Sequence, residues 1–409
     1  MEKLRIAIVG AGPVGLEAAL YAVTLGHRVR VYERGAVGDH VREWGHVRLF
    51  SHFGINRSSL GLRVLRKSGH LLPDDDVYQT GAEYVRDYLE PLARSEPLRD
   101  TIREQTEVLR IGRDRLLKRD LIGGGREAYP FRLLVREGAR ETIETADVVL
   151  DCSGTWALAN PLGSGGIPAP GETAAAARYR LDDIAGGDRD RYEGKRVLLV
   201  GSGHSAATAL DQLSQLDNTQ VVWVRRGDGK TPYALHENDP LPERDRLGRL
   251  GNRIAAGEQP GVEVRAGTVV ECLETTTDGN VRVTLAGPSG EEEIVVDTVL
   301  ALVGFRPDRN IYGELQVHEC WATMGPMKLA ATLLDAGDAD CLTQESAGAE
   351  ALKSPEPLFF ILGAKSYGKN VNFLIRLGLD QIREVFTLIE RDPTLDLYKA
   401  ARLEVSQDG

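Results

Sequence analysis

The sequence has few cysteines, and their spacing excludes several classes of site. Cys152, Cys272, Cys320 and Cys341 are widely spaced in a chain of 409 residues and form no C-x-x-C or other close pair. This spacing argues against a disulfide framework, a zinc site and a redox centre made of neighbouring cysteines, so no metal site is predicted. Each cysteine is more simply explained as a small buried apolar residue.

Basic residues and long apolar runs are also scarce. The formal net charge is −11 at pH 7, whereas a surface that binds nucleic-acid phosphates needs an excess of basic residues. No apolar run approaches the ~20 residues that a helix needs to cross a membrane, and a strand begins almost at Met1, where a leader would lie. We therefore expect a cytoplasmic enzyme of about two or three domains, without nucleic acid or membrane as a partner. The oligomeric state stays open, with a homodimer as one expectation.

A strand, a glycine-rich turn and a helix follow one another at the start of the chain. Arg5–Val9 is an apolar run of strand length, residues 10–15 have the pattern G-x-G-x-x-G, and Leu16–Leu25 is rich in Leu and Ala. Arg28–Tyr32 resembles a second strand, and Glu33 stands at its end. This order predicts a βαβ unit that binds a dinucleotide.

Each glycine of this turn has a physical role in the predicted site. Gly10 allows the tight turn, Gly12 lets the backbone approach a pyrophosphate, and Gly15 lets the helix pack close to the strand. The helix N-terminus offers unpaired N–H groups and a positive dipole end to the pyrophosphate, and Glu33 can accept hydrogen bonds from an adenosine ribose. The alternative is a glycine-rich turn without a ligand, which explains the whole arrangement less well.

Residues 44–58 combine aromatic and polar side chains. Trp44, two Phe, two His, two Arg and Asn56 lie within fifteen residues. Aromatic faces with polar tips suit a pocket that holds a flat cofactor or substrate. A packed loop with surface histidines is the alternative, which the residues leave open.

Helical and strand patterns continue up to a linker rich in Gly and Pro at residues 160–173, which predicts a domain boundary. Thr80–Arg94 has the apolar spacing of an amphipathic helix. We expect one strand over Ile102–Ile111, a hairpin from residues 129–135 and 141–145, and an apolar strand over residues 146–155 that ends in a glycine turn.

A second βαβ pattern follows the linker. Arg196–Val200 resembles a strand, residues 201–206 have the pattern G-x-G-x-x-A, and a further strand ends at Arg225 and Arg226. A carboxylate at that place suits a free ribose hydroxyl, whereas guanidinium groups suit a 2′-phosphate. The pattern predicts a second dinucleotide site that selects NADPH over NADH. The alternative is that both arginines face solvent.

The remainder of the chain predicts more short strands and two helices. The strands are expected at residues 262–264, 268–273, 281–285, 292–297, 299–303 and 359–362, and the helices near residues 328–334 and over 372–389. The last strand, glycine turn and helix would aim another helix N-terminus into the site. The expected fold is α/β with two Rossmann-like dinucleotide-binding domains, one made of residues 1–160 and 299–409 and the other, residues 161–298, inserted into it.

Two dinucleotide-binding domains in one chain imply two dinucleotides, and the simplest chemistry for the pair is hydride transfer from a nicotinamide to a flavin. The order of motifs resembles the two-dinucleotide-binding-domain flavoproteins, which include the flavin-containing monooxygenases and the pyridine nucleotide-disulfide reductases. The motifs that carry the resemblance are those at residues 10–15, 152–155, 201–206 and 302–308.

Within that group the sequence is more similar to the monooxygenases. Residues 43–44 and 53–57 look like the stretch that leads to an Asn beside the flavin, residues 80–89 are similar to the helix after it, and residues 107–108 match the strand whose backbone meets the adenine. The resemblance implies an FAD site made of Gly10, Gly12, Pro13, Gly15, Glu33, Arg34, Trp44, Val108, Gly154 and Gly363. It implies an NADPH site made of Gly201, Gly203, Ser205, Arg225 and Arg226.

Two features depart from those families. Residues 171–193 lack the F-x-G-x-x-x-H-x-x-x-F/W signature of the monooxygenases. The Gly-Asp pair that holds the ribityl chain in the disulfide reductases is Gly363-Ala364 here, and Lys365 follows, so a cation is expected near the flavin where an acid is usual.

The expected function is that of an FAD- and NADPH-dependent monooxygenase, in which O₂ and reduced flavin form a C4a-(hydro)peroxyflavin that oxidises a small organic substrate. Asn56 would hold the flavin or NADP⁺, and Arg57 or Lys365 would stabilise negative charge on the reduced ring. Two alternatives stay open. One is a reductase or dehydrogenase without oxygen insertion, and the other is a non-catalytic flavin-binding redox sensor.

Overall fold

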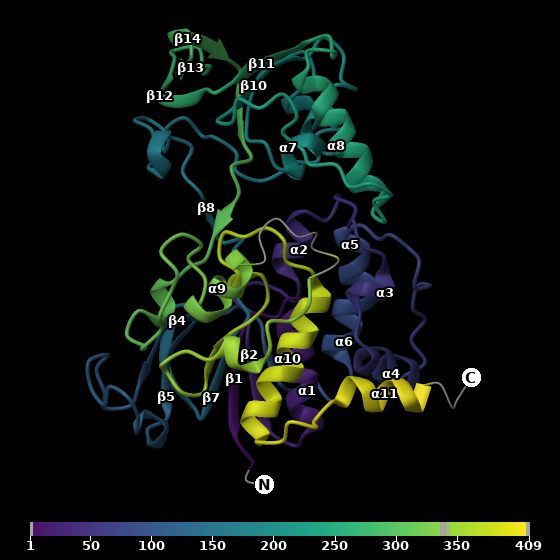
Figure 1. Cartoon of the computed structure of the whole chain (residues 1–409), viewed down its shortest axis with the longest axis vertical. Coiled ribbons are helices and arrows are strands. Elements are labelled where there is room, and N and C mark those ends of the chain that lie inside the picture. The colour runs from purple at the N-terminus through teal and green to yellow at the C-terminus, as the bar shows by residue number, and fades with distance from the viewer. Residues whose placement is uncertain (1–2, 336–341, 343, 406–409) are drawn as a thin grey trace. The chain divides into compact units, whose positions relative to one another are not determined.

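The computed structural model describes residues 3–335, 342 and 344–405, and the chain divides into two compact units. The first unit comprises residues 1–158 and 306–409, and the second comprises residues 159–305 (Figure 1). The sequence placed the end of the inserted part at residue 298. In the structure, β15 (Thr298–Ala301) pairs with β9 (Arg196–Val200), so the second unit continues to residue 305.

A parallel sheet lies at the centre of the first unit. Its five strands have the spatial order β17 (Phe359–Ile361), β7 (Val148–Asp151), β1 (Arg5–Val9), β2 (Arg28–Tyr32) and β3 (Ile102–Arg103). Successive side chains of a strand point to opposite faces, and in β1 both faces are buried. Ile6 and Ile8 belong to the cluster that contains the helices, whereas Ala7 and Val9 belong to a second cluster on the other face.

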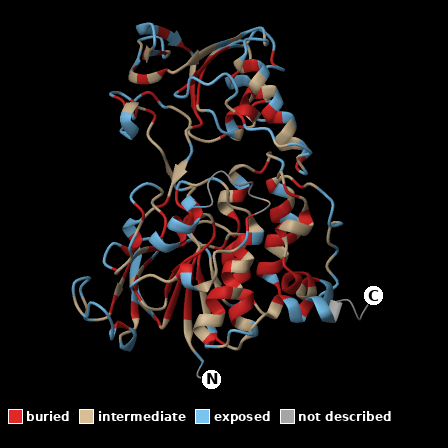
Figure 2. Cartoon of the chain, viewed as in Figure 1, coloured by how far each residue is buried: buried red, intermediate tan, exposed pale blue. Residues whose placement is uncertain are grey.

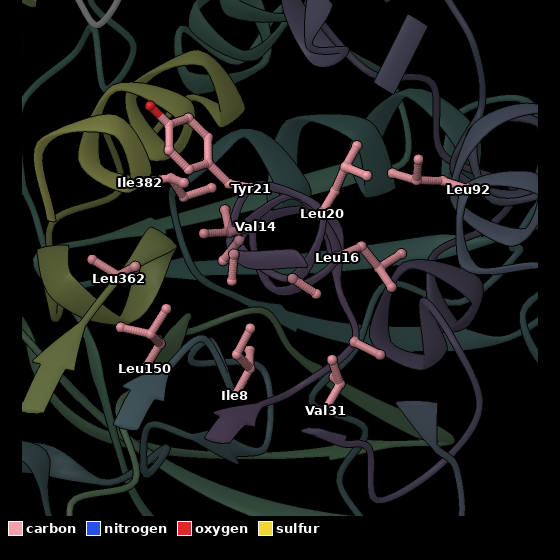
Figure 3. Packing of buried hydrophobic residues seen from close by; sticks show 14 of the residues in the cluster. Ile8, Val14, Leu16, Leu20, Tyr21, Val31, Leu92, Leu150, Leu362 and Ile382 are labelled. Atoms are coloured by element: carbon pink, nitrogen blue, oxygen red, sulfur yellow. The ribbon is translucent and has the colours of Figure 1, made fainter. Parts of the chain in front are cut away.

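Helix α1 (Pro13–Thr24) covers the first of these faces. Figure 3 shows Ile8, Leu150 and Val31, from three neighbouring strands, pointing toward it. Residues Val14 to Ala22 of α1 are all buried, because α10 (Ile375–Glu390) packs on its other side. An apolar composition on every face of a helix is what burial on all sides requires. The predicted late helix is therefore confirmed, although it begins at Ile375 instead of Asn372.

An antiparallel meander packs on the opposite face of the sheet. Its strands are β4 (Thr106–Arg113), β5 (Phe131–Glu137) and β6 (Arg140–Ala146), so the predicted hairpin is confirmed. The single strand predicted over Ile102–Ile111 was wrong. Gln105 has a left-handed backbone with φ of 52°, and the chain turns there, so β3 joins the parallel sheet and β4 joins the meander.

Short helices occupy the segment between β2 and β3, part of which the sequence predicted to be irregular. They are α2 (Asp39–Glu43), α3 (Phe53–Asn56) and α4 (Ser59–Lys67). The helix predicted over Thr80–Arg94 is present as α5 (Gly81–Tyr84), the π-helical turn η1 (Val85–Leu89) and α6 (Glu90–Arg94). It begins with a capping box, in which Thr80 and Glu83 each bind the backbone N–H of the other.

The remaining elements of the first unit are short, except for two helices. The helices are α9 (Met327–Asp335), close to its predicted place, and α11 (Leu397–Val405), which was not predicted. The 3₁₀ turns are η2 (Arg126–Ala128), η5 (Asn310–Tyr312), η6 (Ala349–Leu352) and η7 (Gly363–Tyr367). Figure 2 shows that the central strands, α1 and α10 form the buried part of this unit.

The second unit repeats the βαβ pattern on a smaller scale. Its parallel sheet has the order β11 (Val262–Ala266), β10 (Gln220–Arg225), β9 and β15, and its two helices are α7 (His204–Leu213) and α8 (Pro242–Ala255). The predicted short strands form a meander of β12 (Val269–Thr275), β13 (Val281–Gly287) and β14 (Gly290–Val296). Two 3₁₀ turns, η3 (Ser164–Gly166) and η4 (Arg189–Arg191), precede β9. Short strands β8 (Leu158–Ala159) and β16 (Phe305–Arg306) pair where the chain passes between the units.

A buried ion network joins the meander of the first unit to the chain just before β17. Glu356 accepts hydrogen bonds from Arg113 Nε at 2.8 Å, Arg126 Nε at 3.0 Å and the Gln316 N–H at 2.9 Å. All three charged side chains are at most 1% exposed. Burial opposes ionisation of Glu356, but the bonds from Arg126, Gln316 and Arg113 outweigh it and lower its pKa.

Replacing Glu356 should therefore strongly destabilise the first unit. Glu356→Ala leaves two buried guanidinium groups without their acid, and breaking such a network costs about 3–5 kcal/mol. The matched control is Glu350→Ala, because Glu350 pairs with Lys353 at an exposed site, where solvent screens the attraction and the loss of the pair should have little effect. The free energy of unfolding, measured in urea, should separate the two variants. Equal losses would contradict the role assigned to the network.

Candidate functional site

The turn between β1 and α1 is close-packed at two of its glycines and open at the third. Gly10 has φ of +98°, and a Cβ there would lie 2.8 Å from the carbonyl oxygen of Cys152. A Cβ on Gly15 would lie 2.0 Å from the carbonyl oxygen of Gly10, which no side chain permits. At Gly12, none of the described residues comes within 4 Å of the Cβ position. The fold thus requires Gly10 and Gly15, whereas Gly12 leaves room for a ligand.

The N-terminus of α1 opens onto this room. Gly12 is the N-cap, and no side chain of the described part of the chain caps the helix. Pro13 occupies the first turn, where its missing N–H costs no hydrogen bond. The first-turn N–H groups and the positive end of the helix dipole are therefore available to an anion such as a pyrophosphate.

Glu33 lies at the end of β2, as the sequence predicted, and its carboxylate is held by backbone groups. It accepts hydrogen bonds from the N–H of Ala11 at 2.7 Å and of Gly35 at 2.9 Å. Burial raises the pKa of Glu33, and these two hydrogen bonds oppose that rise. The carboxylate is thus fixed beside the glycine turn, and its contact with a ribose stays a prediction. The neighbouring Arg34 has its Nη2 3.0 Å from Nε2 of His40.

Three other residues of the predicted FAD site lie in different surroundings. Trp44 is half-buried, with its ring centroid 6.5 Å from that of Trp156. The side chain of Val108 is part of the buried cluster under the meander, so only its backbone could meet a ligand. Gly154 has φ of +69°, and the described residues leave its Cβ position open.

The two polar residues expected beside the flavin both have partners in their own segment. Asn56 is buried, donating from Nδ2 to the Ser51 carbonyl at 2.9 Å and accepting from Ser51 Oγ at 2.8 Å. Arg57 donates through Nε and Nη2 to the two carboxylate oxygens of Asp75. Asn56 thus shapes its own loop, and Asp75 balances the charge of Arg57. Their roles toward a flavin stay predictions.

Lys365 forms a buried ion pair at the carboxyl ends of the parallel strands. Its Nζ lies 2.7 Å from Oδ2 of Asp151, the last residue of β7, and donates to Ser153 Oγ at 2.9 Å. Both charged side chains are at most 1% exposed, and the ring of Tyr312 lies 5.2 Å from Nζ. Ligands of open α/β sheets bind at this edge. The predicted cation is therefore present there, but with an acidic partner that sequence reasoning did not identify.

Gly363 lies under the first turn of α1. It has φ of +70°, and a Cβ there would lie 3.2 Å from Val14 Cγ2. Its N–H donates to Gln381 Oε1 at 2.8 Å, which fixes the turn to α10. A direct contact of Gly363 with a cofactor stays a prediction.

The second glycine turn has the same construction as the first. Gly201 has φ of +132°, and a Cβ there would lie 2.2 Å from the carbonyl oxygen of Leu302. Gly203 is the N-cap of α7 without a side-chain cap, and the described residues leave its Cβ position open. Ser205, in the first turn of α7, is exposed. This turn too can present free N–H groups to a phosphate.

Two aromatic side chains that were not predicted fix the carbonyl groups of this turn. Trp223 donates from Nε1 to the Gly201 carbonyl at 2.7 Å, and Tyr233 donates its hydroxyl to the Gly203 carbonyl at 3.2 Å. Both side chains are buried. The sequence indicated only that Trp223 lies in a strand. It did not indicate the contact of Tyr233, because Tyr233 lies thirty residues after Gly203 in the chain.

The two arginines at the end of β10 differ in exposure. Arg225 is buried, and its Nη1 donates to the carbonyl groups of Gly227 at 3.1 Å and Gly229. Burial lowers the pKa of Arg225. Arg226 is exposed. The alternative that both arginines face solvent is therefore wrong for Arg225, and the 2′-phosphate contact predicted for the pair is untested.

The described residues contain no cluster of metal ligands, and the described cysteines are unpaired. Within residues 3–335, 342 and 344–405, no three His, Cys, Asp or Glu side chains gather as metal ligands would. Cys152, Cys272 and Cys320 are free, and Cys341 lies outside the described residues. Burial raises the pKa of the Cys152 thiol.

No helix in the described part of the chain has both the length and the apolar character needed to span a bilayer.

Comparisons with known proteins give matches to solved structures alone, since no family model and no curated protein matches. The bacillithiol disulfide reductase Bdr of Bacillus cereus is similar with a TM-score of 0.66 and 17% identity, covering 95% of this chain and 99% of that one. The T. acidophilum thioredoxin reductase has a TM-score of 0.58 and 17% identity over 96% and 99%. The ornithine N-hydroxylase of Kutzneria sp. 744 has a TM-score of 0.63 and 14% identity over 95% and 99%.

These similarities show the fold. The chain has the two-dinucleotide-binding-domain fold shared by these reductases and hydroxylases, which confirms the fold predicted from the order of motifs. At such identities the fold is common to enzymes with different reactions, so function has to be argued from the site.

Two substitutions in the first glycine turn should affect different properties, one the stability of the fold and the other the binding of FAD. Gly15→Ala places a methyl group against the Gly10 carbonyl, so we expect a large loss of stability. Gly12→Ala, at an ordinary φ of −80°, should leave the melting temperature within a few degrees of the original. It should nevertheless weaken FAD binding by at least about tenfold, because its methyl group occupies the phosphate position. Thermal melting and fluorescence titration with FAD measure the two effects, and unchanged FAD affinity in a folded Gly12→Ala variant would contradict the assignment.

Proposed function

We propose that this chain is an oxidoreductase that binds FAD at the first glycine turn and NADPH at the second. The observation that carries the proposal is the repeated geometry of Gly12 and Gly203, each facing open space at an uncapped helix N-terminus. Two such turns in one chain suit two pyrophosphates. The similar ornithine N-hydroxylase structure contains reduced FAD and NADP⁺, which supports the same pair of cofactors here.

At the first turn, the residues fit a flavin dinucleotide in the following way. The N–H groups of the first turn of α1 would bind the pyrophosphate, and Glu33 would accept hydrogen bonds from the adenosine ribose. Lys365 lies at the edge where the rest of the cofactor would extend, held by Asp151 and Ser153. FAD supplies a carrier that takes two electrons from a nicotinamide and passes them on. The protein's part is to bind, orient and shield it.

At the second turn, we assign different roles to the two arginines because Arg225 is buried and Arg226 is exposed. The exposed Arg226 is the residue that we assign to the 2′-phosphate of NADPH, through a charge-assisted hydrogen bond. The buried Arg225 would shape the loop that presents it, since its guanidinium group binds the carbonyl groups of Gly227 and Gly229.

For the overall reaction we propose oxygenation of a small organic substrate. NADPH, a proton, O₂ and the substrate would give NADP⁺, water and the substrate with one added oxygen atom. The similarity of residues 43–57 to the monooxygenases supports this reaction. The absence of a close cysteine pair from the sequence argues against reduction of a disulfide through a protein dithiol.

A reductase without oxygen insertion is the second candidate. It is favoured by the missing monooxygenase signature in residues 171–193 and by the engagement of Asn56 with Ser51. The disulfide reductases among the similar structures also support it. In this case electrons would pass from NADPH through the flavin to an organic acceptor, and no oxygen atom would enter a product.

The cofactor preference provides one test. Arg226→Ala should raise the KM for NADPH by about 10- to 100-fold, because a charge-assisted hydrogen bond contributes about 1.5–3 kcal/mol, and should leave the KM for NADH nearly unchanged. Arg225→Ala is the comparison variant. It should weaken the binding of NADPH and NADH to a similar extent, because it removes the hydrogen bonds that hold the loop at Gly227 and Gly229. Steady-state kinetics with each nucleotide give the two ratios. Equal effects of Arg226→Ala on NADPH and NADH would refute the 2′-phosphate contact.

The stoichiometry of oxygen use provides the other test. The purified protein should carry flavin absorbance, and in a screen of amine, sulfide and ketone substrates an oxygenase consumes one O₂ and forms one oxygenated product for each NADPH. An oxygen electrode, NADPH absorbance and mass spectrometry with ¹⁸O₂ follow the three quantities. NADPH oxidation that proceeds at full rate without O₂, given an organic acceptor, would select the reductase. A protein that binds no FAD on reconstitution would refute both candidates.

A further inference from the structure

Helix α1 carries a buried carboxyl group close to the glycine turn. Glu17 is 1% exposed. Its Oε1 accepts a hydrogen bond from the Tyr88 hydroxyl, while its Oε2 is buried and has no partner among the described residues. Buried polar atoms are nearly always hydrogen-bonded, so an acid with one unpaired oxygen inside the principal core needs an explanation.

Tyr88 connects this acid to the segment Asn56–Ser58. The Tyr88 hydroxyl accepts a hydrogen bond from the Ser58 N–H at 3.1 Å, and Ser58 Oγ in turn caps α4 by accepting from the Gly61 N–H at 2.8 Å. One turn earlier, Tyr84 donates to the Asn56 carbonyl at 2.6 Å. Tyr88 belongs to the π-helical turn η1, a distortion that often marks functional positions.

The packing around the acid is tight. A Cβ on Gly61 would lie 2.2 Å from the Tyr88 hydroxyl oxygen and 3.0 Å from Glu17 Oε1. Helix α4 can therefore approach only because Gly61 has no side chain. Glu17, Tyr88 and α4 are thus packed directly against one another.

In the described part of the chain, the titratable groups whose pKa responds to Glu17 are phenols. Burial, and in each case the charge of Glu17, raise the pKa of Tyr84 in α5, of Tyr88 in η1 and of Tyr398 in α11. Asp380 of α10 acts on the pKa of Tyr398 in the same direction. The basic residues of α4 and α11 that could compensate a carboxylate are mostly exposed: Arg66, Lys67, Lys399 and Arg402, with Arg63 partly so. Burial raises the pKa of Glu17 to about 7, and the hydrogen bond from Tyr88 opposes that rise.

We propose that Glu17 is a proton-binding positioning residue, which holds α1, α4 and the Asn56–Ser58 segment together while its carboxyl group is protonated and loosens them when it ionises. Protonated, Oε2 becomes a donor, and the acceptor that we assign to it is the Tyr398 hydroxyl, a second buried group without a partner among the described residues. Ionised, the carboxylate is a buried charge for which the salt bridges of the described residues provide no cation, and such a charge is strongly unfavourable. The effect on catalysis, but not the proton binding itself, rests on the proposed function and on the place beside the flavin that the sequence predicted for Asn56.

The direction of the pH dependence follows from linkage. Between about pH 4.5 and 7 the folded chain retains a proton that the unfolded chain has lost, so stability is highest below this window and falls as pH rises through it. For a pKa that moves from 4.5 to about 7, the folding equilibrium constant should fall by roughly 10- to 100-fold between pH 5 and 8 from this group alone.

Glu17→Gln tests the proposal because glutamine keeps the shape and cannot ionise. Urea unfolding of the cofactor-free protein is measured at pH 5, 6, 7 and 8. Between pH 5 and 8 the folding equilibrium constant of the original chain should fall roughly 10- to 100-fold further than that of Glu17→Gln. The matched control is Glu83→Gln, since Glu83 is a partly exposed acid whose pKa is lowered mainly by its cap hydrogen bond with the Thr80 backbone. The control should keep the slope of the original chain. Hydrogen exchange should show the Ser58–Leu62 amides less protected at pH 8 in the original chain and unchanged in Glu17→Gln.

Identical pH slopes for the original chain and Glu17→Gln would overturn the proposal. If Glu17→Gln does not fold, the infrared band of a protonated carboxyl group in the original chain decides, because it should be present at pH 6 and absent at pH 8.5. Its absence at pH 6 would also overturn the proposal. These measurements use no cofactor, so they stand if the chain binds no FAD. With FAD bound, the rate of flavin release should rise between pH 6 and 8 in the original chain only, and an equal rise in Glu17→Gln would refute the coupling to the site.

Discussion

The contact of helix α1 with the backbone of its own glycine turn is the constraint on which the first unit depends. The Cβ position of Gly15 lies 2.0 Å from the Gly10 carbonyl, so the helix starts directly against the edge of the sheet. This closeness leaves the first-turn N–H groups beside the open space at Gly12. The same contact brings Val14 against Gly363 and Gly378, so the late part of the chain can close over α1. The second unit meets the same requirement with Gly201 and Leu302.

Charges buried near this edge show a second constraint. Asp151 and Lys365 are an ion pair from the ends of β7 and η7, more than two hundred residues apart in the chain. A buried pair of this kind contributes little stability of its own, because desolvation offsets the attraction. The pair does, however, place a cation and the Ser153 hydroxyl at the carboxyl ends of the strands, the edge at which open α/β sheets bind their ligands.

Local patterns predicted much of this fold, because local physics produces them. Both glycine turns, their flanking strands and the meanders follow from short-range periodicity and turn chemistry. The break at Gln105 was missed, because one residue with positive φ leaves the apolar pattern of residues 102–111 intact. Helix α8 was missed because its charged, glycine-containing sequence hides the few buried positions, among them Leu247 and Ile254. Glu17, Asp151 and Tyr233 could not be identified, since their partners lie far away along the chain.

The inserted order of the two units has a consequence during synthesis. Strand β17 and helix α10 lie at residues 359–390, after the whole second unit. Until the ribosome has released them, the sheet of the first unit lacks an edge strand and α1 lacks the helix that covers its outer side. The second unit, whose segment is contiguous, can fold in that interval, whereas the first unit keeps apolar surface exposed. The apolar surface of the first unit therefore stays open to non-native contacts until residues 359–390 have left the ribosome.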